Sequence, residues 1–257
     1  METTKTLNAS VLKAIGLLNY FSQDKPSWGV RELASATGAN QSTTYRLMAS
    51  LASEGILQQN PETEKYHLGL KLFELGNRVN IKTSLVNITH PCLQKVTEEI
   101  KETVHLGVLQ AYQVLMVDKI ASPMGLQLKS SVGSYSPAYC TGIGKVLLSN
   151  LSDIELKAYL KHVPLVKRTS FTIRSKTKFV KELKKIKQQS FAIDRQELEQ
   201  GLICVAVPVF NKNNQMIAAM SAAGPADRFR EEAIEDYVAI LTSGAIKIQQ
   251  RIGAFNF

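Results

Sequence analysis

The sequence predicts an α+β protein of two domains: a small helical domain with a β-hairpin, then a larger domain with an antiparallel sheet. Its 257 residues exceed what one hydrophobic core usually serves, because single cores stop growing near about 250 residues. In the first third of the chain, apolar residues recur at helical spacing and are followed by two short apolar runs. In the remaining two thirds, strand-like and helical patterns alternate irregularly, which is typical of an α+β domain. We place the domains at residues 1–76 and 91–257, joined by a linker helix at 77–90.

The first domain begins with a predicted helix from a cap at Ser10 to about Phe21. Four apolar residues recur at i, i+3, i+4 and i+7, which indicates one buried face. They are Val11, Ala14, Ile15 and Leu18. A polar stretch at residues 22–27 breaks this helix. A short second helix follows and ends at Gly38, because glycine is the usual residue just past a helix C-terminus.

A third helix is predicted to open at Asn40, a good N-cap, and to end at Gly55. Its buried stripe has the same spacing and comprises Thr44, Leu47, Met48 and Leu51. Two short apolar runs, at residues 56–57 and 66–68, flank a turn that starts with Asn-Pro, which is typical of a hairpin. Two helices joined by a tight turn and followed by a hairpin form a winged helix-turn-helix.

The second domain is predicted to mix strands and helices. The pattern is helical over residues 71–100, with Pro91 expected in the first turn of a new helix. Strands are predicted at residues 104–109, 114–120, 126–130, 202–210 and 216–222. Helices are predicted at residues 141–149, 153–160 and 176–188 and from residue 231. The last helix is expected to bury Ile234, Val238, Leu241, Ala245 and Ile248.

The net charge of +9 is concentrated in the second domain. Residues 161–187 hold ten Lys and Arg against the single acid Glu182, whereas residues 1–80 hold eight against seven. The basic isoelectric point is therefore weak support for nucleic-acid binding by the first domain. A solvated helical face is the simplest interpretation of the basic segment, and contact with an operator or within an oligomer is left open.

Several classes of protein and site are not expected. No stretch of about 20 apolar residues could span a membrane and no signal peptide is seen, so a cytoplasmic protein without membrane contact is expected. Neither cysteine nor histidine shows metal-ligand spacing, so no metal and no cofactor are predicted. The run at residues 142–145 hints at a phosphate loop, but Tyr139 stands where that motif needs glycine. It is interpreted as a helix start that faces a small anion or as a tight structural turn.

The exposed face of the third helix carries short polar side chains and one arginine near its start. A recognition helix needs this pattern, because its first side chains reach base edges. The predicted DNA-binding residues are Gln41, Ser42, Thr43, Tyr45 and Arg46.

Together with segments of the second domain, these residues make the chain resemble the IclR family of transcriptional regulators over nearly its whole length. The matching segments fall in family order at family spacing: Glu32-Leu33-Ala34, Ser42-Thr43-Thr44-Tyr45-Arg46-Leu47, Glu54-Gly55, Tyr66-His67-Leu68-Gly69, Thr141-Gly142-Ile143-Gly144-Lys145, Phe191-Ala192-Ile193-Asp194, Glu197-Leu198, Cys204-Val205-Ala206-Val207-Pro208 and Ser221-Ala222-Ala223-Gly224-Pro225. Asn40 replaces a proline that many members carry, and both residues suit a helix start.

The resemblance implies a GAF-like effector domain and a homodimer, or a dimer of dimers, on a palindromic double-stranded operator. It also implies a regulator, most often a repressor of a catabolic operon, that responds to a small carboxylate. The effector-contacting positions that match by motif are Gly142, Ile143, Asp194, Cys204 and Ser221. Ala223 stands where some members have a second serine, which favours a less polar or differently shaped effector.

The alternative is an enzyme or signalling sensor that uses the GAF-like domain. A nucleophile would have to come from Cys140 or Cys204 with a histidine as base, but no Cys-His signature surrounds either thiol. His105 is interpreted as a buried core residue. No catalytic residue is predicted.

Overall fold

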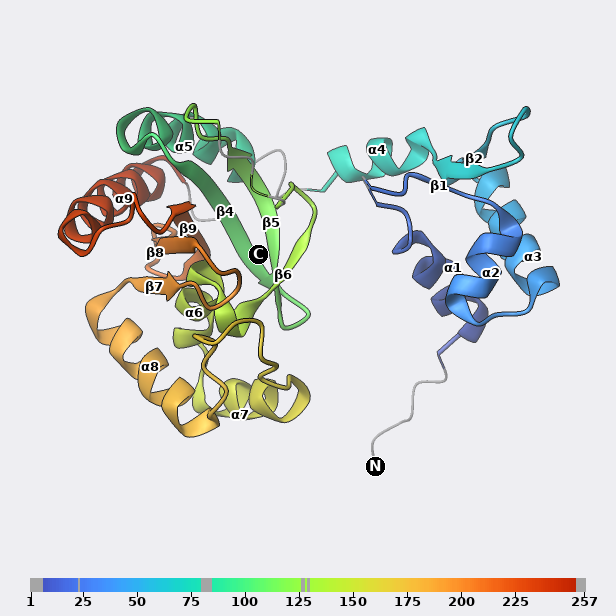
Figure 1. Cartoon of the computed structure of the whole chain (residues 1–257). Helices are drawn as coiled ribbons and strands as arrows, with labels where there is room; N and C mark the ends of the chain where they lie inside the picture. The colour runs from blue at the N-terminus through green and yellow to red at the C-terminus, as the bar shows by residue number, and fades with distance from the viewer. Residues whose placement is uncertain (1–6, 23, 80–84, 126–127, 129, 253–257) are drawn as a thin grey trace. The chain divides into compact units, whose positions relative to one another are not determined.

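The computed structural model describes most of the chain as two compact units, Met1–Thr83 and Ser84–Phe257 (Figure 1). The described residues are 7–22, 24–79, 85–125, 128 and 130–252. The predicted linker helix at 77–90 includes residues 80–84, which lie outside this description, so its bounds stay a prediction.

The first unit has the helix-turn-helix and hairpin that the sequence predicts. Its elements are α1 (Ala9–Leu18), β1 (Ser27–Trp28), α2 (Val30–Thr37), α3 (Gln41–Ser53), β2 (Leu57–Gln59), β3 (Tyr66–Leu68) and α4 (Leu70–Asn77). The three strands form an antiparallel sheet in the order β1-β3-β2. The sequence does not predict β1, because a strand of two residues leaves no alternating pattern. Gly38 ends α2 with φ +68°, which glycine adopts without the steric penalty that a Cβ brings.

The prediction for the first helix needs correction. Asn8, not Ser10, is its N-cap, because the Asn8 side chain accepts the N–H groups of Ser10 and Val11. The helix also ends at Leu18 rather than near Phe21. Its core contacts come from Leu17 and from Leu18 of the predicted stripe, whereas Val11 and Ile15 of that stripe are 52% and 57% exposed. Only the C-terminal end of the predicted stripe therefore faces the core of this unit.

The second unit is an antiparallel sheet with helices on both faces. Its elements are α5 (Asn87–Ile100), β4 (Thr103–Gln110), β5 (Gln113–Ile120), β6 (Tyr135–Pro137), the 3₁₀ turn η2 (Ala138–Cys140), α6 (Gly142–Ser149), α7 (Asp153–His162), α8 (Lys176–Gln189), β7 (Ala192–Arg195), β8 (Leu202–Phe210), β9 (Met216–Pro225) and α9 (Glu231–Arg251). The strand order is β6-β5-β4-β9-β8-β7. α6 packs on one face of this sheet, with α8 outside it, and α5 and α9 pack on the other face (Figure 1).

Several predictions for the second unit are confirmed or corrected by these bounds. Most of the buried stripe of α9 and the whole apolar face of α8 lie in the core. Residues 126, 127 and 129 of the predicted strand 126–130 lie outside the described part. Leu128 and Ser130 are in no strand, because their carbonyls accept from Lys119 Nζ at 2.9 and 2.6 Å instead of a neighbouring strand. Pro91 lies inside α5 rather than in its first turn.

Candidate functional site

The exposed start of α3 carries all five residues predicted to read DNA. Asn40 caps the helix, and its side-chain oxygen accepts from Ser42 N at 2.8 Å. The inner face is anchored by Thr44 and Met48, both fully buried, so the opposite face is held outward. The exposed residues on that face are Gln41, Ser42, Thr43, Tyr45 and Arg46. This surface can present hydroxyl, amide and guanidinium groups to base edges and phosphates.

The hairpin beside α3 is held by its turn residue. The Asn60 side chain accepts the N–H groups of Glu62 at 2.9 Å and Thr63 at 3.0 Å, and Asn60 N donates to the Lys65 carbonyl at 2.8 Å. These bonds close the turn between β2 and β3, as its Asn-Pro start predicts.

A cavity of about 260 Å³ lies in the second unit between the sheet and the start of α6. It brings together all five residues that the sequence matches to effector contacts, Gly142, Ile143, Asp194, Cys204 and Ser221. The other residues that line it are His105, Met116, Leu128, Ser130, Ser134, Tyr135, Ser136, Thr141, Leu198, Glu199, Leu202 and Ala223. Apolar and hydroxyl side chains therefore together line a space suited to a small molecule.

Strand register explains how distant residues reach this cavity. Asp194 on β7 pairs with Cys204 on β8, and Cys204 pairs with Ala223 on β9. Ser221, two residues before Ala223, pairs with His105 on β4. Because side chains two apart on a strand point to the same face, these five residues line one side of the sheet.

The start of α6 supplies backbone donors to the cavity. Thr141 caps this helix by accepting from Gly144 N at 3.2 Å, and the first helical bond runs from Lys145 N to Thr141 O. The N–H groups of Gly142 and Ile143 precede that bond and so have no partner within the helix. Both residues line the cavity, where such N–H groups favour an anion.

Gly144 allows α6 to pack closely against the preceding turn. A Cβ on Gly144 would lie 2.1 Å from the Ala138 carbonyl oxygen and 2.3 Å from Ala138 Cα. Both neighbours are backbone atoms, so no side-chain rotation could make room. The Gly-Ile-Gly-Lys run is thus tightly packed at the helix start, which is compatible with both interpretations offered for it.

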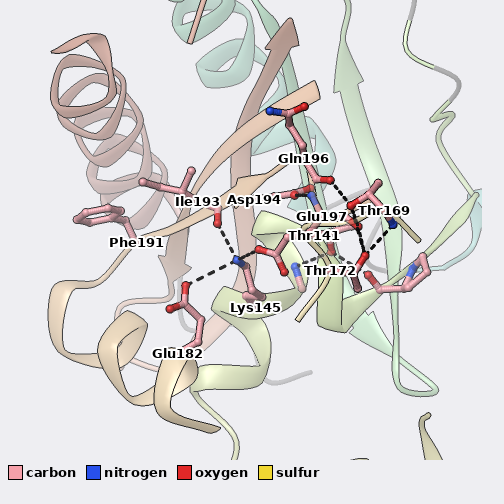
Figure 2. A network of polar contacts seen from close by, with 12 residues as sticks. Thr141, Lys145, Thr169, Thr172, Glu182, Phe191, Ile193, Asp194, Gln196 and Glu197 are labelled. Carbon is pink, nitrogen blue, oxygen red and sulfur yellow. Dashed lines mark hydrogen bonds and ion pairs between the residues drawn. The ribbon is translucent and has the colours of Figure 1, made fainter. Parts of the chain in front are cut away.

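A buried ion-pair network lies next to the cavity (Figure 2). Lys145, 1% exposed, reaches from α6 to the carboxylate of Glu197 and donates to the Ile193 carbonyl at 2.6 Å. The second carboxylate is Glu182 of α8, whose Oε1 lies 3.7 Å from Lys145 Nζ. Glu197 N in turn donates to Asp194 Oδ1 at 2.6 Å. One lysine therefore ties α6, α8 and the loop after β7 to the aspartate that lines the cavity.

Burial controls the protonation of these groups. Desolvation raises the pKa of Asp194 to about 7, which the Glu197 N–H opposes and the Glu197 charge assists. Desolvation likewise raises the pKa of Glu197, against the effect of the Lys145 ammonium. For His105, desolvation and the charge of Lys119 lower the pKa to about 4, so the ring is neutral at pH 7, with Nε2 lying 2.7 Å from Ser130 Oγ.

The cysteines lack the features of a nucleophile. Burial raises the pKa of Cys140 to about 12 and that of Cys204 well above its usual value. Both thiols are therefore protonated at neutral pH, the less reactive form. Among the described residues, no cluster of three or more His, Cys, Asp or Glu side chains could hold a metal ion. No helix in the described part is both long and apolar enough to cross a membrane.

Sequence reasoning missed three parts of this site. His105 is buried as predicted, yet it also lines the cavity, and only its pairing with Ser221 across two strands reveals this. Lys145 stands in the rejected phosphate-loop motif, and its ion pair with Glu197, 52 residues away, has no local signal. The wall formed by Ser130, Ser134 and Ser136 comes from a segment without clear periodicity.

Comparisons with known proteins agree with this architecture. The model of the IclR helix-turn-helix domain matches residues 10–61, and the model of the bacterial transcriptional regulator IclR C-terminal domain matches residues 78–250. The HTH-type transcriptional regulator KdgR of Escherichia coli K12 is 35% identical over 249 residues, covering 97% of this chain and 94% of KdgR.

Solved structures are similar over nearly the whole chain. The crystal structure of Thermotoga maritima IclR is 31% identical with a TM-score of 0.72, covering 95% of this chain and 98% of that one. An IclR homologue from Microbacterium hydrocarbonoxydans, complexed with 4-hydroxybenzoate, is 21% identical with a TM-score of 0.85 and shows a shared fold over 95% of this chain and 99% of its own.

Both domain models and the curated relatives describe regulators of transcription and not enzymes. The enzyme alternative is therefore excluded, and the first unit is a helix-turn-helix DNA-binding domain. The chain belongs to the IclR family of bacterial transcriptional regulators.

Proposed function

We propose that the chain is a repressor that binds a palindromic operator through α3 and responds to a small carboxylate held in the cavity of the second unit. The observation that carries this proposal is the cavity itself, where the α6 N–H groups that have no partner within the helix meet Ser221, Asp194 and neutral His105. Helix-start N–H groups suit a carboxylate, and the apolar walls suit a short carbon skeleton. The relative complexed with 4-hydroxybenzoate binds a carboxylate of this size class.

A thermal-shift screen tests the effector. The full-length protein is heated with a panel of small carboxylates, sugar acids and aromatic acids, because a ligand of the native state raises stability by RT ln(1 + [L]/Kd). Compounds that raise the melting temperature are then tested for release of the protein from DNA of its own upstream intergenic region. A carboxylate that stabilises the protein and weakens this complex is the expected result. Stabilisation by uncharged analogues alone would contradict the carboxylate assignment.

The Ser221→Ala substitution should weaken the effector response. Ser221 is 3% exposed and lines the cavity, so its hydroxyl can reach a ligand there. Removing it should cost about 1 to 3 kcal/mol of effector affinity if it bonds a polar ligand atom. The midpoint of the effector titration should rise, while the melting temperature and DNA affinity of the effector-free protein stay near wild type. An unchanged titration would place the effector elsewhere.

The Arg46→Ala substitution should abolish tight operator binding without unfolding the protein. Arg46 is exposed on α3 and contributes nothing to the core. Loss of an arginine contact to a base should cost about 1 to 3 kcal/mol, or roughly 5- to 150-fold in affinity. Gel shifts on upstream intergenic DNA measure this loss, and Arg230→Ala removes the same charge from an exposed site in the second unit as a control. Equal affinities of the two variants would remove Arg46 from the interface.

A homodimer is part of this proposal, because a palindromic operator presents two identical half-sites. Exposed apolar side chains of the first unit support it. Val11 and Ile15 on α1 are 52% and 57% exposed, and Leu70 and Phe73 on α4 are 80% and 67% exposed. Such side chains are expected to be covered by a second copy of the chain. The same proposal allows a dimer of dimers. Sedimentation at working concentration distinguishes a dimer from a tetramer by mass.

A further inference from the structure

A basic surface covers the second unit from the end of α7 to the end of α8. Residues 161–187 hold ten Lys and Arg side chains, and all ten are exposed. We call these ten side chains the basic surface. The only acid in the segment, Glu182, lies within 3.7 Å of buried Lys145 and so does not neutralise it.

The basic surface does not serve internal stability. Within the described part of the chain, none of its ten side chains forms an ion pair. Like charges three and four residues apart on a helix repel one another. A helical face that is only solvated usually mixes both signs, whereas every exposed charged residue of α8 is a cation. An anionic partner explains this arrangement.

The geometry of α8 suits a regular row of phosphates. Phe179, Leu183 and Ile186 are buried against the unit, and Lys178, Lys181 and Lys185 project to the opposite side. Lys178 and Lys185 are about 10 Å apart along the helix axis, at 1.5 Å per residue. One strand of DNA carries about three phosphates over the same axial length, at 3.4 Å each.

A second copy of this chain offers too little negative charge to occupy the basic surface. The acidic stretch at residues 227–236 holds five acids and two arginines, a net charge of −3, against +9 for the basic surface with Glu182. DNA is already the partner of the first unit, whose residues 1–80 have a net charge of only +1. Once α3 is on DNA, the flanking duplex is present at high effective concentration.

We propose that the basic surface of residues 161–187 contacts the phosphate backbone of double-stranded DNA as a second, sequence-independent contact beside that of α3. This inference rests on the proposed DNA-binding function. It assigns to the second unit much of the non-specific affinity that a nearly neutral first unit cannot supply.

Salt dependence of DNA binding tests the inference on the full-length protein. The variant Lys178→Gln/Lys181→Gln/Lys185→Gln removes three charges from the basic surface and keeps good helix formers. The control Lys95→Gln/Lys212→Gln/Lys247→Gln removes three exposed charges elsewhere in the second unit. Affinity for a random-sequence duplex is measured from about 50 to 200 mM salt, over which phosphate contacts weaken steeply.

The basic-surface variant should lose up to about 2.7 units of slope in log K against log salt, at 0.9 per phosphate contact. The control should keep the wild-type slope. Equal slopes for the two variants would overturn the inference. So would a variant that keeps the slope but loses the wild-type oligomer in sedimentation, because the basic surface would then face another copy.

A second duplex, from the upstream intergenic region, separates this inference from the proposed function. The basic-surface variant should prefer this duplex over random DNA by the same ratio as wild type, because its lysines contact no bases. A wild-type protein without any preference, but with the slope difference intact, would overturn the operator-binding proposal and support the phosphate contact. A wild-type protein that prefers the upstream duplex, with equal slopes for the basic-surface variant and its control, would support the operator-binding proposal and overturn the phosphate contact.

Discussion

The Lys145→Met substitution is expected to lower the free energy of unfolding of the second unit by about 3 to 5 kcal/mol, because it leaves a buried carboxylate without its partner. Glu197 is 4% exposed and pairs with Lys145 through Oε1, and its Oε2 has no hydrogen-bond partner among the described residues. Met fills a similar volume, so the loss reflects charge and not a cavity. A second variant, Lys145→Met/Glu197→Gln, should recover much of the stability because the uncompensated charge is gone.

The two units make this measurement selective. The only tryptophan of the chain, Trp28, lies in the first unit, so its fluorescence follows that unit alone. Circular dichroism in urea reports both units. Lys145→Met should shift the circular dichroism transition and leave the Trp28 transition in place. Lys247→Met, which changes an exposed lysine of α9, is the matched control. If both variants unfold at the same urea concentration, the ion pair does not hold this unit together.

The Asp194→Asn substitution is expected to stabilise the second unit in alkaline solution and to remove a pH dependence. The pKa of Asp194 is about 7 in the folded protein and 3.8 when unperturbed. Between these values the folded state binds a proton that the unfolded state has released. Stability from this group is thus complete below about pH 4 and lost as the pH rises through 7, a change of ~4 kcal/mol. Asn mimics the protonated acid, and its oxygen can still accept from Glu197 N.

Unfolding of wild type and Asp194→Asn in urea at pH 5 and pH 8.5 measures this effect. The variant should be the more stable at both, by about 1.6 kcal/mol at pH 5 and by ~4 kcal/mol at pH 8.5, because the loss of wild-type stability begins at the unfolded pKa of 3.8. Effector binding should follow the same titration, because a charged Asp194 repels a carboxylate in the same cavity. Glu98→Gln, on the exposed side of α5, is the control for loss of one carboxylate. Parallel pH profiles for wild type and Asp194→Asn would contradict the raised pKa.

Elements with strong local signals were predictable from the sequence. β8 ends where predicted because the Asn-rich turn after it is closed locally, with the Asn211 side-chain oxygen accepting from Asn213 N at 2.9 Å and Gln215 N at 3.0 Å. The cap of α3 at Asn40 is likewise a local bond. Short strands such as β1 and β7 were not predictable, because their extended shape comes from partners far along the chain. The burial of Val11 and Ile15 on α1 was predicted wrongly, because an amphipathic pattern does not say which surface covers the apolar face.

The candidate site was predictable only where motif resemblance supplied it. Gly142 and Asp194 belong to recognisable segments, and the structure brings them to one cavity. His105 belongs to a segment that also reads as plain core, so its place in the wall depends on strand register. Lys145 illustrates the limit most clearly, since a buried charge is predictable only when its partner, Glu197, is known.

The contact between Gly144 and Ala138 separates the parts of the cavity that can change over evolution from the part that cannot. Any side chain at position 144 would collide with backbone, so the floor that presents the Gly142 and Ile143 amides is closed to substitution. The wall residues Ser221 and Ala223 project from strands into open space and can be exchanged one at a time. Under the proposed function, descendants of this chain can therefore acquire new effectors by altering the walls while inheriting the same backbone floor.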